Sequence, residues 1–141
     1  MQFSVDILFS GFSGKLADCA LGWGTWALIR NGKNNILLDT GGVGLRQNFD
    51  AILAKYQLTR TEIDYVLLTH LHFDHACNVD LLPNATFVLS AREWEFANSR
   101  VNRDYFIQES ALTFLRSAKL HLIHNDGEEV IPGITALLAR G

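Results

Sequence analysis

Three histidines and an aspartate are concentrated in the six residues from His70 to His75, directly after the apolar segment Tyr65–Leu68. From residue 69 the sequence reads Thr-His-Leu-His-Phe-Asp-His. Polar side chains are costly to bury unless they are hydrogen-bonded or coordinate a metal, so few structural needs place so many at the end of a core strand. Binding of a divalent metal is one such need. Imidazole and carboxylate ligands together suit zinc, with iron and manganese as the other candidates.

The spacing of these side chains predicts two neighbouring metal sites. Residues i, i+2 and i+4 of an extended segment point the same way, so His70, His72 and Asp74 share one side of the chain. His75 points elsewhere unless the backbone turns, and Asp74 is a suitable N-cap for a short helix that would turn it. We therefore expect His70 and His72 to hold one metal, and Asp74 and His75 to hold a second beside it.

The composition argues against several other classes of protein. The 141 residues, 48% of them hydrophobic, suffice for one core. A net charge of -3 with scattered Lys and Arg gives no reason to expect nucleic acid. No apolar run reaches the roughly 18 residues of a membrane span, and the first residues do not resemble a signal peptide. Cys19 and Cys77 make no disulfide framework, so we expect a cytoplasmic protein that binds neither nucleic acid nor membrane.

The order of the predicted elements describes a layered α/β domain with a mixed sheet. Two apolar runs around Asn31-Gly32 predict a β-hairpin with a type I′ turn. An apolar stripe from Leu45 to Tyr56 predicts a helix, and capping-box spacing occurs at residues 59–62 and 90–93. Strands are expected over residues 2–9, 25–30, 35–40, 65–69, 85–89, 120–124, 130–131 and 134–139, with further helices over 91–98 and 104–118.

The run from Thr69 to Ala76 resembles the His-x-His-x-Asp-His signature of the metallo-β-lactamase superfamily. The segments 36–42 and 132–134 agree with this signature, and the sequence Leu-His-Phe-Asp-His-Ala is most similar to the acyl-homoserine lactonase branch. The resemblance implies an αββα sandwich built from two pseudo-symmetric halves. Residues 1–141 would form a single incomplete domain, the N-terminal half, with a mixed sheet and flanking helices. One departure is Cys77-Asn78, where many members have glycines.

By resemblance, His70 and His72 are ligands of the first metal, and Asp74 and His75 are ligands of the second, with Asp74 also the candidate catalytic residue. The implied cofactor is zinc, as two ions in the complete site, with iron or manganese as alternatives. For Asp39 two interpretations stay open: a carboxylate that orients a ligand histidine, or a turn residue at a strand end. In family enzymes a hydroxide that bridges the two metals attacks a carbonyl or phosphoryl centre.

The function that the resemblance implies is hydrolysis of a small molecule with a lactone, ester or thioester bond. The family site also uses a later histidine, a bridging aspartate and a final histidine, which no position here matches. His121 and His124 are expected to lie outside the site. Since catalytic zinc usually has three protein ligands, we expect a C-terminal half or a partner chain to complete the site, and this chain alone to be inactive.

Two alternatives to a hydrolase follow from the same residues. The first is a non-catalytic metal-binding or assembly module, in which the open face of the half-fold pairs with a second copy or another chain. The second is a redox protein of the flavodiiron type, which fits less well because that branch typically has a glutamate where His72 stands. Phe12, Trp23 and Trp26 are expected to be packing residues, with the lining of an apolar substrate pocket as the alternative.

Overall fold

The computed structural model describes residues 2–19, 22–99 and 104–139. Six strands form one sheet in which each strand lies beside the one before it in the sequence. The first three are antiparallel, and the third to sixth are parallel. The strands are β1 (Ser4–Phe9), β2 (Trp26–Arg30), β3 (Asn35–Leu38), β4 (Tyr65–Leu67), β5 (Thr86–Ser90) and β6 (Lys119–Ile123), and a separate hairpin comprises β7 (Glu129–Ile131) and β8 (Ile134–Thr135). The predicted mixed α/β architecture is confirmed.

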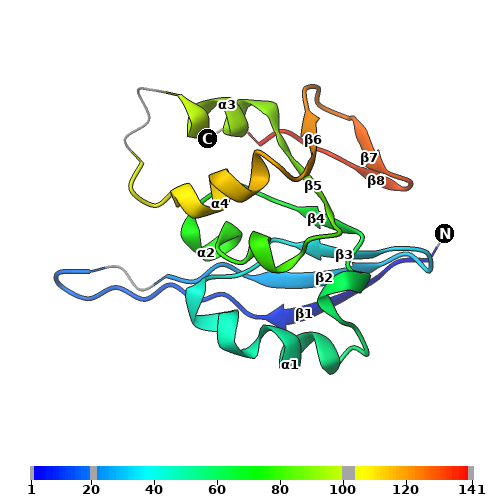
Figure 1. Cartoon of the computed structure of the whole chain (residues 1–141), viewed down its shortest axis with the longest axis horizontal. Coiled ribbons are helices and arrows are strands. Elements are labelled where there is room, and N and C mark those ends of the chain that lie inside the picture. The colour runs from blue at the N-terminus through cyan, green and yellow to red at the C-terminus, as the bar shows by residue number, and fades with distance from the viewer. Residues whose placement is uncertain (1, 20–21, 100–103, 140–141) are drawn as a thin grey trace.

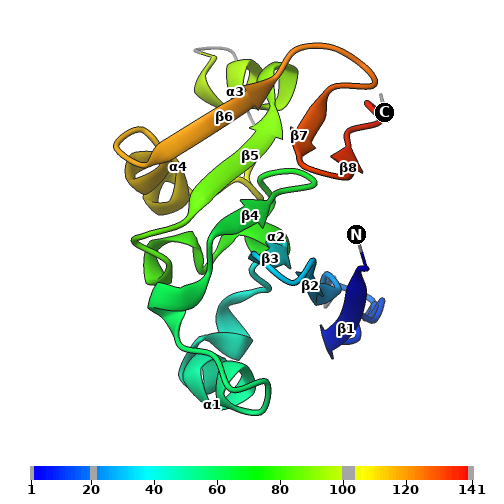
Figure 2. The ribbon, with the colours of Figure 1, turned by 90° about the vertical axis from the view of Figure 1, so that its right-hand side faces the viewer.

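The helices are short and gather mainly on one side of the sheet. They are α1 (Phe49–Ala54), α2 (Phe73–Ala76), α3 (Ala91–Asn98) and α4 (Glu109–Leu115), with 3-10 turns η1 (Val43–Asn48), η2 (Arg60–Glu62) and η3 (Val79–Leu81). In Figure 2, α1 and α4 lie on one side of the sheet and the β7–β8 hairpin lies on the other. Among the described residues, no helix has the length and apolar character needed to cross a membrane.

The core lies between the helices and one face of the sheet. The strand register aligns Leu28, Leu37, Val66 and Phe87 in one row across β2 to β5. All four are fully buried, because alternate residues of a strand point to the same face. The side chains that pack against this face from the helices include Phe49, Leu53, Ala111, Leu112 and Leu115. Full burial stabilises by roughly 1.5–3 kcal/mol for each such side chain, so this layer holds the sheet in place.

The opposite face of the sheet is also apolar, and it is only partly covered. Its residues Ile7, Ala27, Leu38, Leu67 and Val88 are aligned across β1 to β5. On the β1 side the face is open, since the side chains of Val5 and Ile7 are 63% and 55% exposed. On the other side, β7, β8 and residues 136–139 lie over it and leave a cleft of about 900 Å³.

Several predicted boundaries were wrong for identifiable reasons. The hairpin around Asn31-Gly32 forms, but only Gly32 has a positive φ, because the Asn31 side chain accepts hydrogen bonds from the Lys33 and Asn34 N–H groups and makes a longer loop. The strand expected over 134–139 ends at Thr135, which pairs with Glu129 at the start of β7. The helix expected over 104–118 begins only at Glu109, because residues 104–107 contact the histidine segment instead.

Of the two expected capping boxes, one formed. Thr59 and Glu62 make the reciprocal bonds at the start of η2, with the Glu62 carboxylate accepting the Thr59 N–H at 2.8 Å. Ser90 makes no side-chain cap at the start of α3, although this helix has the predicted bounds. The Glu93 carboxylate, expected to complete that box, instead accepts the Leu71 N–H at 2.9 Å.

An ion pair between η1 and η3 should make stability depend on pH. Both Asp80 oxygens accept hydrogen bonds from Arg46, at 2.8 and 2.6 Å, and this bonding holds the pKa of Asp80 below its ordinary value. A carboxyl group whose pKa is lower in the folded than in the unfolded protein stabilises the fold at pH values above its ordinary pKa. This stabilisation is lost as the pH falls through the folded-state pKa. Because both side chains are about 40% exposed, Asp80→Asn should cost no more than about 1 kcal/mol near neutral pH.

Urea unfolding of wild type and Asp80→Asn, at neutral pH and near pH 3, measures this contribution. The free-energy difference between the two proteins should shrink at the lower pH. Asp18→Asn, on the exposed β1–β2 connection, is the charge-matched control. An equal difference in unfolding free energy between wild type and Asp80→Asn at both pH values would contradict the stabilising role of this ion pair.

Candidate metal centre

The histidine segment lies at the edge of the sheet where the parallel strands end. Asp39 directly follows β3, residues 69–75 follow β4, and Glu93 lies in the first turn of α3, which follows β5. The carboxyl ends of neighbouring parallel strands meet at one edge of a sheet, and loops there commonly form binding sites. The topology therefore gathers side chains from three segments around residues 69–75.

Asp39 is the buried residue around which this edge is organised. Only 2% of its surface is exposed, and its φ of 60° is the left-handed conformation that aspartate tolerates better than most residues. The carboxylate accepts hydrogen bonds from the Thr69 N–H at 2.8 Å and the Thr69 hydroxyl at 2.9 Å. It also lies 2.7 Å from Nδ1 of His75. The structure thus places Asp39 in the contact that a histidine-orienting role requires.

These contacts set which ring nitrogen of two histidines is protonated. A carboxylate only accepts hydrogen bonds, so Nδ1–H of His75 donates to Asp39 and Nε2 carries the lone pair. Thr69 has one hydroxyl hydrogen, and when it is donated to Asp39, Thr69 Oγ accepts from Nδ1–H of His70, 3.0 Å away. His70 and His75 therefore both present Nε2, the nitrogen that remains able to bind a metal.

The electrostatic surroundings of the two rings differ. Burial, followed by the neighbouring His75 and His72, lowers the pKa of His70 and favours its neutral form. Burial also acts to lower the pKa of His75, but the hydrogen bond and charge of Asp39 outweigh it and raise that pKa above the ordinary value. Neutral imidazole is the form that coordinates metal, so the surroundings of His70 in particular suit a ligand.

The four predicted ligands, expected to act as two pairs, lie close together. The ring centroids of His70 and His72 are 4.6 Å apart, and an oxygen of Asp74 lies 3.5 Å from Nε2 of His75. The two pairs adjoin, since the His70 and His75 centroids are 4.1 Å apart. Within residues 2–19, 22–99 and 104–139, no three His, Cys, Asp or Glu side chains are placed to hold one ion together. The donor types, imidazole and carboxylate, are those that a divalent metal such as zinc binds.

The short helix expected after the histidines is present but begins earlier. It was predicted to start with Asp74 as its N-cap, whereas α2 starts at Phe73 and has His72 in the N-cap position. Its end is tied to the β3 turn, because the His75 carbonyl accepts the Thr40 N–H at 2.7 Å and the Thr40 hydroxyl at 2.9 Å. The helix turns His75 towards Asp39.

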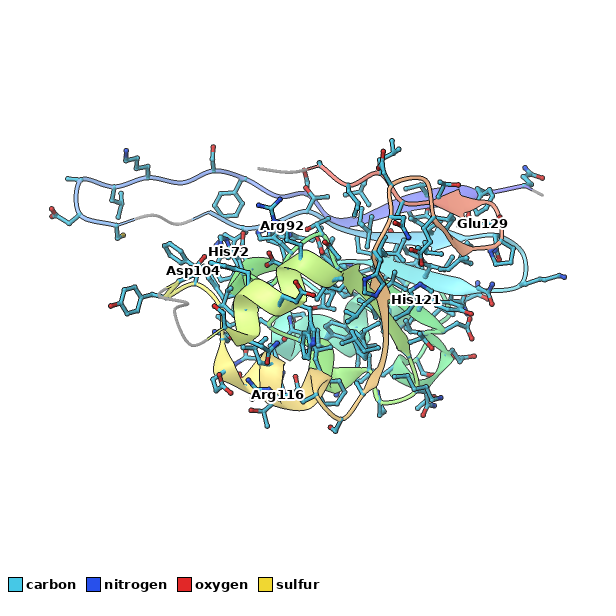
Figure 3. The ribbon with its side chains drawn as sticks, turned by 90° about the horizontal axis from the view of Figure 1, so that it is seen from above. His72, Arg92, Asp104, Arg116, His121 and Glu129 are labelled. Atoms are coloured by element: carbon cyan, nitrogen blue, oxygen red, sulfur yellow. The ribbon has the colours of Figure 1, made fainter. Side chains whose placement is uncertain are left out.

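Three residues with roles at this edge were missed from the sequence. Glu93 accepts the N–H of Leu71, between the two first histidines. Asp104 lies 2.9 Å from Nε2 of His72, and Figure 3 labels both side chains. The Asn78 amide donates to the carbonyls of residues 40, 41 and 42. The sequence predicted that Glu93 completes a capping box and that Asp104 begins a helix, and it marked Asn78 only as a departure from the family signature.

His121, on β6, and His124, directly after it, are not among these pairs. His121 makes an ion pair with Glu128 at 2.8 Å, which lowers the pKa of that carboxyl, and the His124 N–H donates to the same carboxylate. His124 lines the cleft beneath β7, β8 and residues 136–139, which also reaches His70.

The aromatic residues at the start of β2 and in the β1–β2 connection have different surroundings. Trp26 is fully buried and stacks on Phe49 with centroids 4.6 Å apart, so it is a packing residue as expected. Trp23 instead lies beside α2, with its ring 6.1 Å from that of Phe73. Phe12 pairs with Trp23 through two backbone hydrogen bonds and is 53% exposed. In Figure 1 this connection extends from the sheet past α2.

Gly24 leaves room for the His75 ring, and this gives a direct test of the geometry. A Cβ at this position would lie 2.6 Å from Cε1 and 2.7 Å from Nε2 of His75. Gly24→Ala should displace the ring and weaken zinc binding about tenfold, equivalent to about 1.4 kcal/mol, as measured by competition with a chromophoric chelator. Gly22→Ala is the matched control, because its Cβ would meet nothing closer than 3.9 Å. Equal zinc affinity of the two variants would contradict this placement of His75.

Comparison with known proteins agrees with the fold. The sequence profile of the Metallo-beta-lactamase superfamily matches residues 23–139. A probable metallo-hydrolase of Methanocaldococcus jannaschii is 38% identical over 61 residues, which are 43% of this chain and 30% of that protein.

Solved structures with the same fold cover nearly the whole chain. A Thermotoga maritima protein that carries the name metallo-beta-lactamase superimposes with a TM-score of 0.75 at 18% identity, over 94% of this chain and 63% of that one. B. thuringiensis AiiA, with N-decanoyl-L-homoserine bound at its active site, gives 0.68 at 22% identity, over 88% of this chain and 55% of that one. The chain thus spans less than two thirds of these relatives. Since the family profile matches most of its residues, the protein belongs to the metallo-beta-lactamase superfamily.

Proposed function

We propose that this chain supplies one part of a two-metal hydrolase site for a small molecule with a lactone, ester or thioester bond. His70 and His72 would hold one zinc ion, and Asp74 and His75 would hold the other. The observation that carries the proposal is the cluster of three imidazole rings and Asp74 beside buried Asp39. Membership of a metallo-hydrolase superfamily supports the reaction class.

The roles of this chain's own residues follow from the geometry. When bound, the metal ions would lower the pKa of a coordinated water and polarise the scissile carbonyl. Asp39 holds His75 directly, and His70 through Thr69, so that both rings present Nε2 without rearrangement. Asp74, whose side chain is 18% exposed, is the proposed catalytic carboxylate, since it can accept a proton from the attacking water.

The surroundings of the site support a substrate with an apolar portion. The cleft of about 900 Å³ reaches His70, and its walls include Phe96, Ile134 and Leu137. On the other side of the histidines, Trp23, Phe73 and Phe106 make successive ring contacts with centroids 6.1 Å apart. Apolar walls with a few convergent polar groups are typical of small-molecule sites. Among the bonds that the family hydrolyses, this favours a lactone with an apolar chain.

Zinc uptake and hydrolysis, measured separately, test the proposal. Zinc binding should fall in His70→Ala and His75→Ala and persist in His124→Ala, a histidine outside the pairs. Hydrolysis of lactones and thioesters, where present, should stop with chelator and return with zinc. Zinc uptake that is indifferent to His70 and His75, or hydrolysis that chelator does not affect, would contradict it. Zinc binding without hydrolysis would favour the second candidate function.

That second candidate is a metal-binding assembly module, and the open sheet face favours it. Val5 and Ile7 project from β1 and are more than half exposed, and apolar patches of this kind commonly mark interfaces. A second layer over this face, from another segment or a second copy, would also be a source of further metal ligands. Analytical ultracentrifugation of zinc-loaded protein should then show a dimer that Ile7→Asp dissociates. Val43→Asp, at the start of η1 where the residue is 54% exposed, is the control. A monomer without bound metal would rule this candidate out.

A further inference from the structure

The segment that precedes α4 forms an arm against the histidine segment. Residues 104–107 do not continue the helix but run alongside residues 72 and 73. The Phe73 N–H donates to the Phe106 carbonyl at 2.8 Å, and His72 and Ile107 form an antiparallel bridge. The Phe106 ring also contacts the rings of His72 and Phe73, at centroid distances of 5.6 and 6.1 Å. This arm, residues 104–107, is therefore positioned by backbone and side-chain contacts together.

Asp104 uses both of its carboxylate oxygens at this junction. One oxygen accepts the Phe106 N–H at 2.9 Å, a turn of the kind in which an aspartate bonds the backbone two residues later. The other lies 2.9 Å from Nε2 of His72. The side chain is 23% exposed and that of His72 is 36% exposed, so the pair is partly shielded from water. The Phe106 N–H fixes the orientation of the carboxylate, and the carboxylate in turn fixes the ring.

The contact with Asp104 leaves His72 with its lone pair on the opposite ring nitrogen to that of His70 and His75. His70 and His75 are held through Nδ1 and present Nε2. His72 is held through Nε2, which must be protonated because a carboxylate only accepts hydrogen bonds. Its lone pair is therefore on Nδ1, the nitrogen nearer the backbone. Two carboxylates far apart in the sequence thus set opposite tautomers within six residues.

We propose that Asp104 is a positioning residue for the metal site, which holds His72 in the Nε2–H tautomer so that Nδ1 faces the ion shared with His70. This inference rests on the proposed metal site. Carboxylates that orient ligand histidines typically contribute 10- to 100-fold to metal affinity. Asp104 acts through His72 and does not itself contact the ion.

The first measurement is made on metal-free protein. Long-range ¹H–¹⁵N spectra at a pH above the histidine pKa values should show His72 protonated at Nε2, with His70 and His75 protonated at Nδ1. Asp104→Asn keeps an acceptor for the Phe106 N–H but removes the charge, and should give His72 a mixture of tautomers. A wild-type His72 protonated at Nδ1, or a tautomer that Asp104→Ala leaves unchanged, would overturn the proposal.

The second measurement separates positioning from a structural role. Asp104→Ala should lower zinc affinity at least tenfold in the wild-type background and have no further effect in the His72→Ala background. Tyr105→Ala, in the same arm with a side chain that is 93% exposed, should leave affinity unchanged. An equal loss in both backgrounds would overturn the proposal. If wild type took up no zinc, the proposed function would fail, whereas the tautomer spectra would still decide the role of Asp104.

Discussion

Replacing Asp39 with asparagine is expected to lower zinc affinity by about 10- to 100-fold. The Asp39 carboxylate accepts hydrogen bonds from Thr69 and His75 at once, and an amide offers one oxygen and one N–H₂ group in their place. Wherever the amide nitrogen lies, a donor then faces a donor in a site that is 2% exposed. Either the hydrogen bond with Nδ1 of His75 or the one from the Thr69 N–H is lost. A buried unsatisfied group costs about 1–3 kcal/mol of stability as well.

Competition with a chromophoric chelator measures the affinity, and urea unfolding of the metal-free protein measures the stability. Asp64→Asn is the matched control, because Asp64 accepts the Asn35 N–H at 2.8 Å at the opposite end of β3. That variant also replaces a hydrogen-bonded carboxylate with an amide, but its single bond needs only one acceptor oxygen, so zinc affinity should not change. If the two variants bound zinc equally well, the orienting role of Asp39 would be wrong.

Asn78→Ala is expected to produce the largest loss of stability among the single substitutions considered, about 2–4 kcal/mol. Asn78 is fully buried, and its amide hydrogens are shared among three carbonyls of the turn after β3, at 3.0, 3.2 and 3.0 Å. Its own N–H also donates to the Thr40 hydroxyl at 3.2 Å. Alanine would leave buried carbonyls without a donor and open a small cavity.

The free energy of unfolding of Asn78→Ala, from urea titrations, gives the magnitude. Asn84→Ala is the control, since Asn84 is exposed and donates a single hydrogen bond of 3.3 Å to the Thr61 carbonyl. Its unfolding free energy should stay within about 0.5 kcal/mol of wild type. An Asn78→Ala protein as stable as Asn84→Ala would show that the turn keeps its conformation without the amide. Because the same turn contacts His75 through Thr40, zinc affinity should also fall in Asn78→Ala.

Local patterns predicted the features whose causes are local. The alternation of apolar residues placed the strands of the sheet, the spacing from Leu45 to Tyr56 placed the core side of α1, and the apolar run before His70 located the site at the end of β4. The expectation that α3 occupies residues 91–98 was confirmed. Each of these depends on residues close together in the sequence, where a periodic pattern reports directly on which face is buried.

The missed features depend on partners far away in the chain. The Glu93 carboxylate had a local partner in the expected capping box and bonds Leu71 instead, 22 residues earlier. Asp104 fitted a helical pattern, but 32 residues separate it from its partner His72. Such contacts are settled by the three-dimensional packing of loops at one sheet edge, which overrides local preference. For the same reason the sequence left two interpretations of Asp39 open, although its position after β3 was plain.

The consecutive order of the six strands bears on how the protein is made. Each strand that leaves the ribosome finds its neighbour already synthesised, so the sheet can grow in one direction without waiting for a distant partner. Asp39 and residues 69–75 are joined as soon as β3 and β4 pair, whereas Asp104 arrives about thirty residues after them, counted from the 32-residue separation. During synthesis, His70 and His75 would thus acquire their orientation before His72 acquires its own.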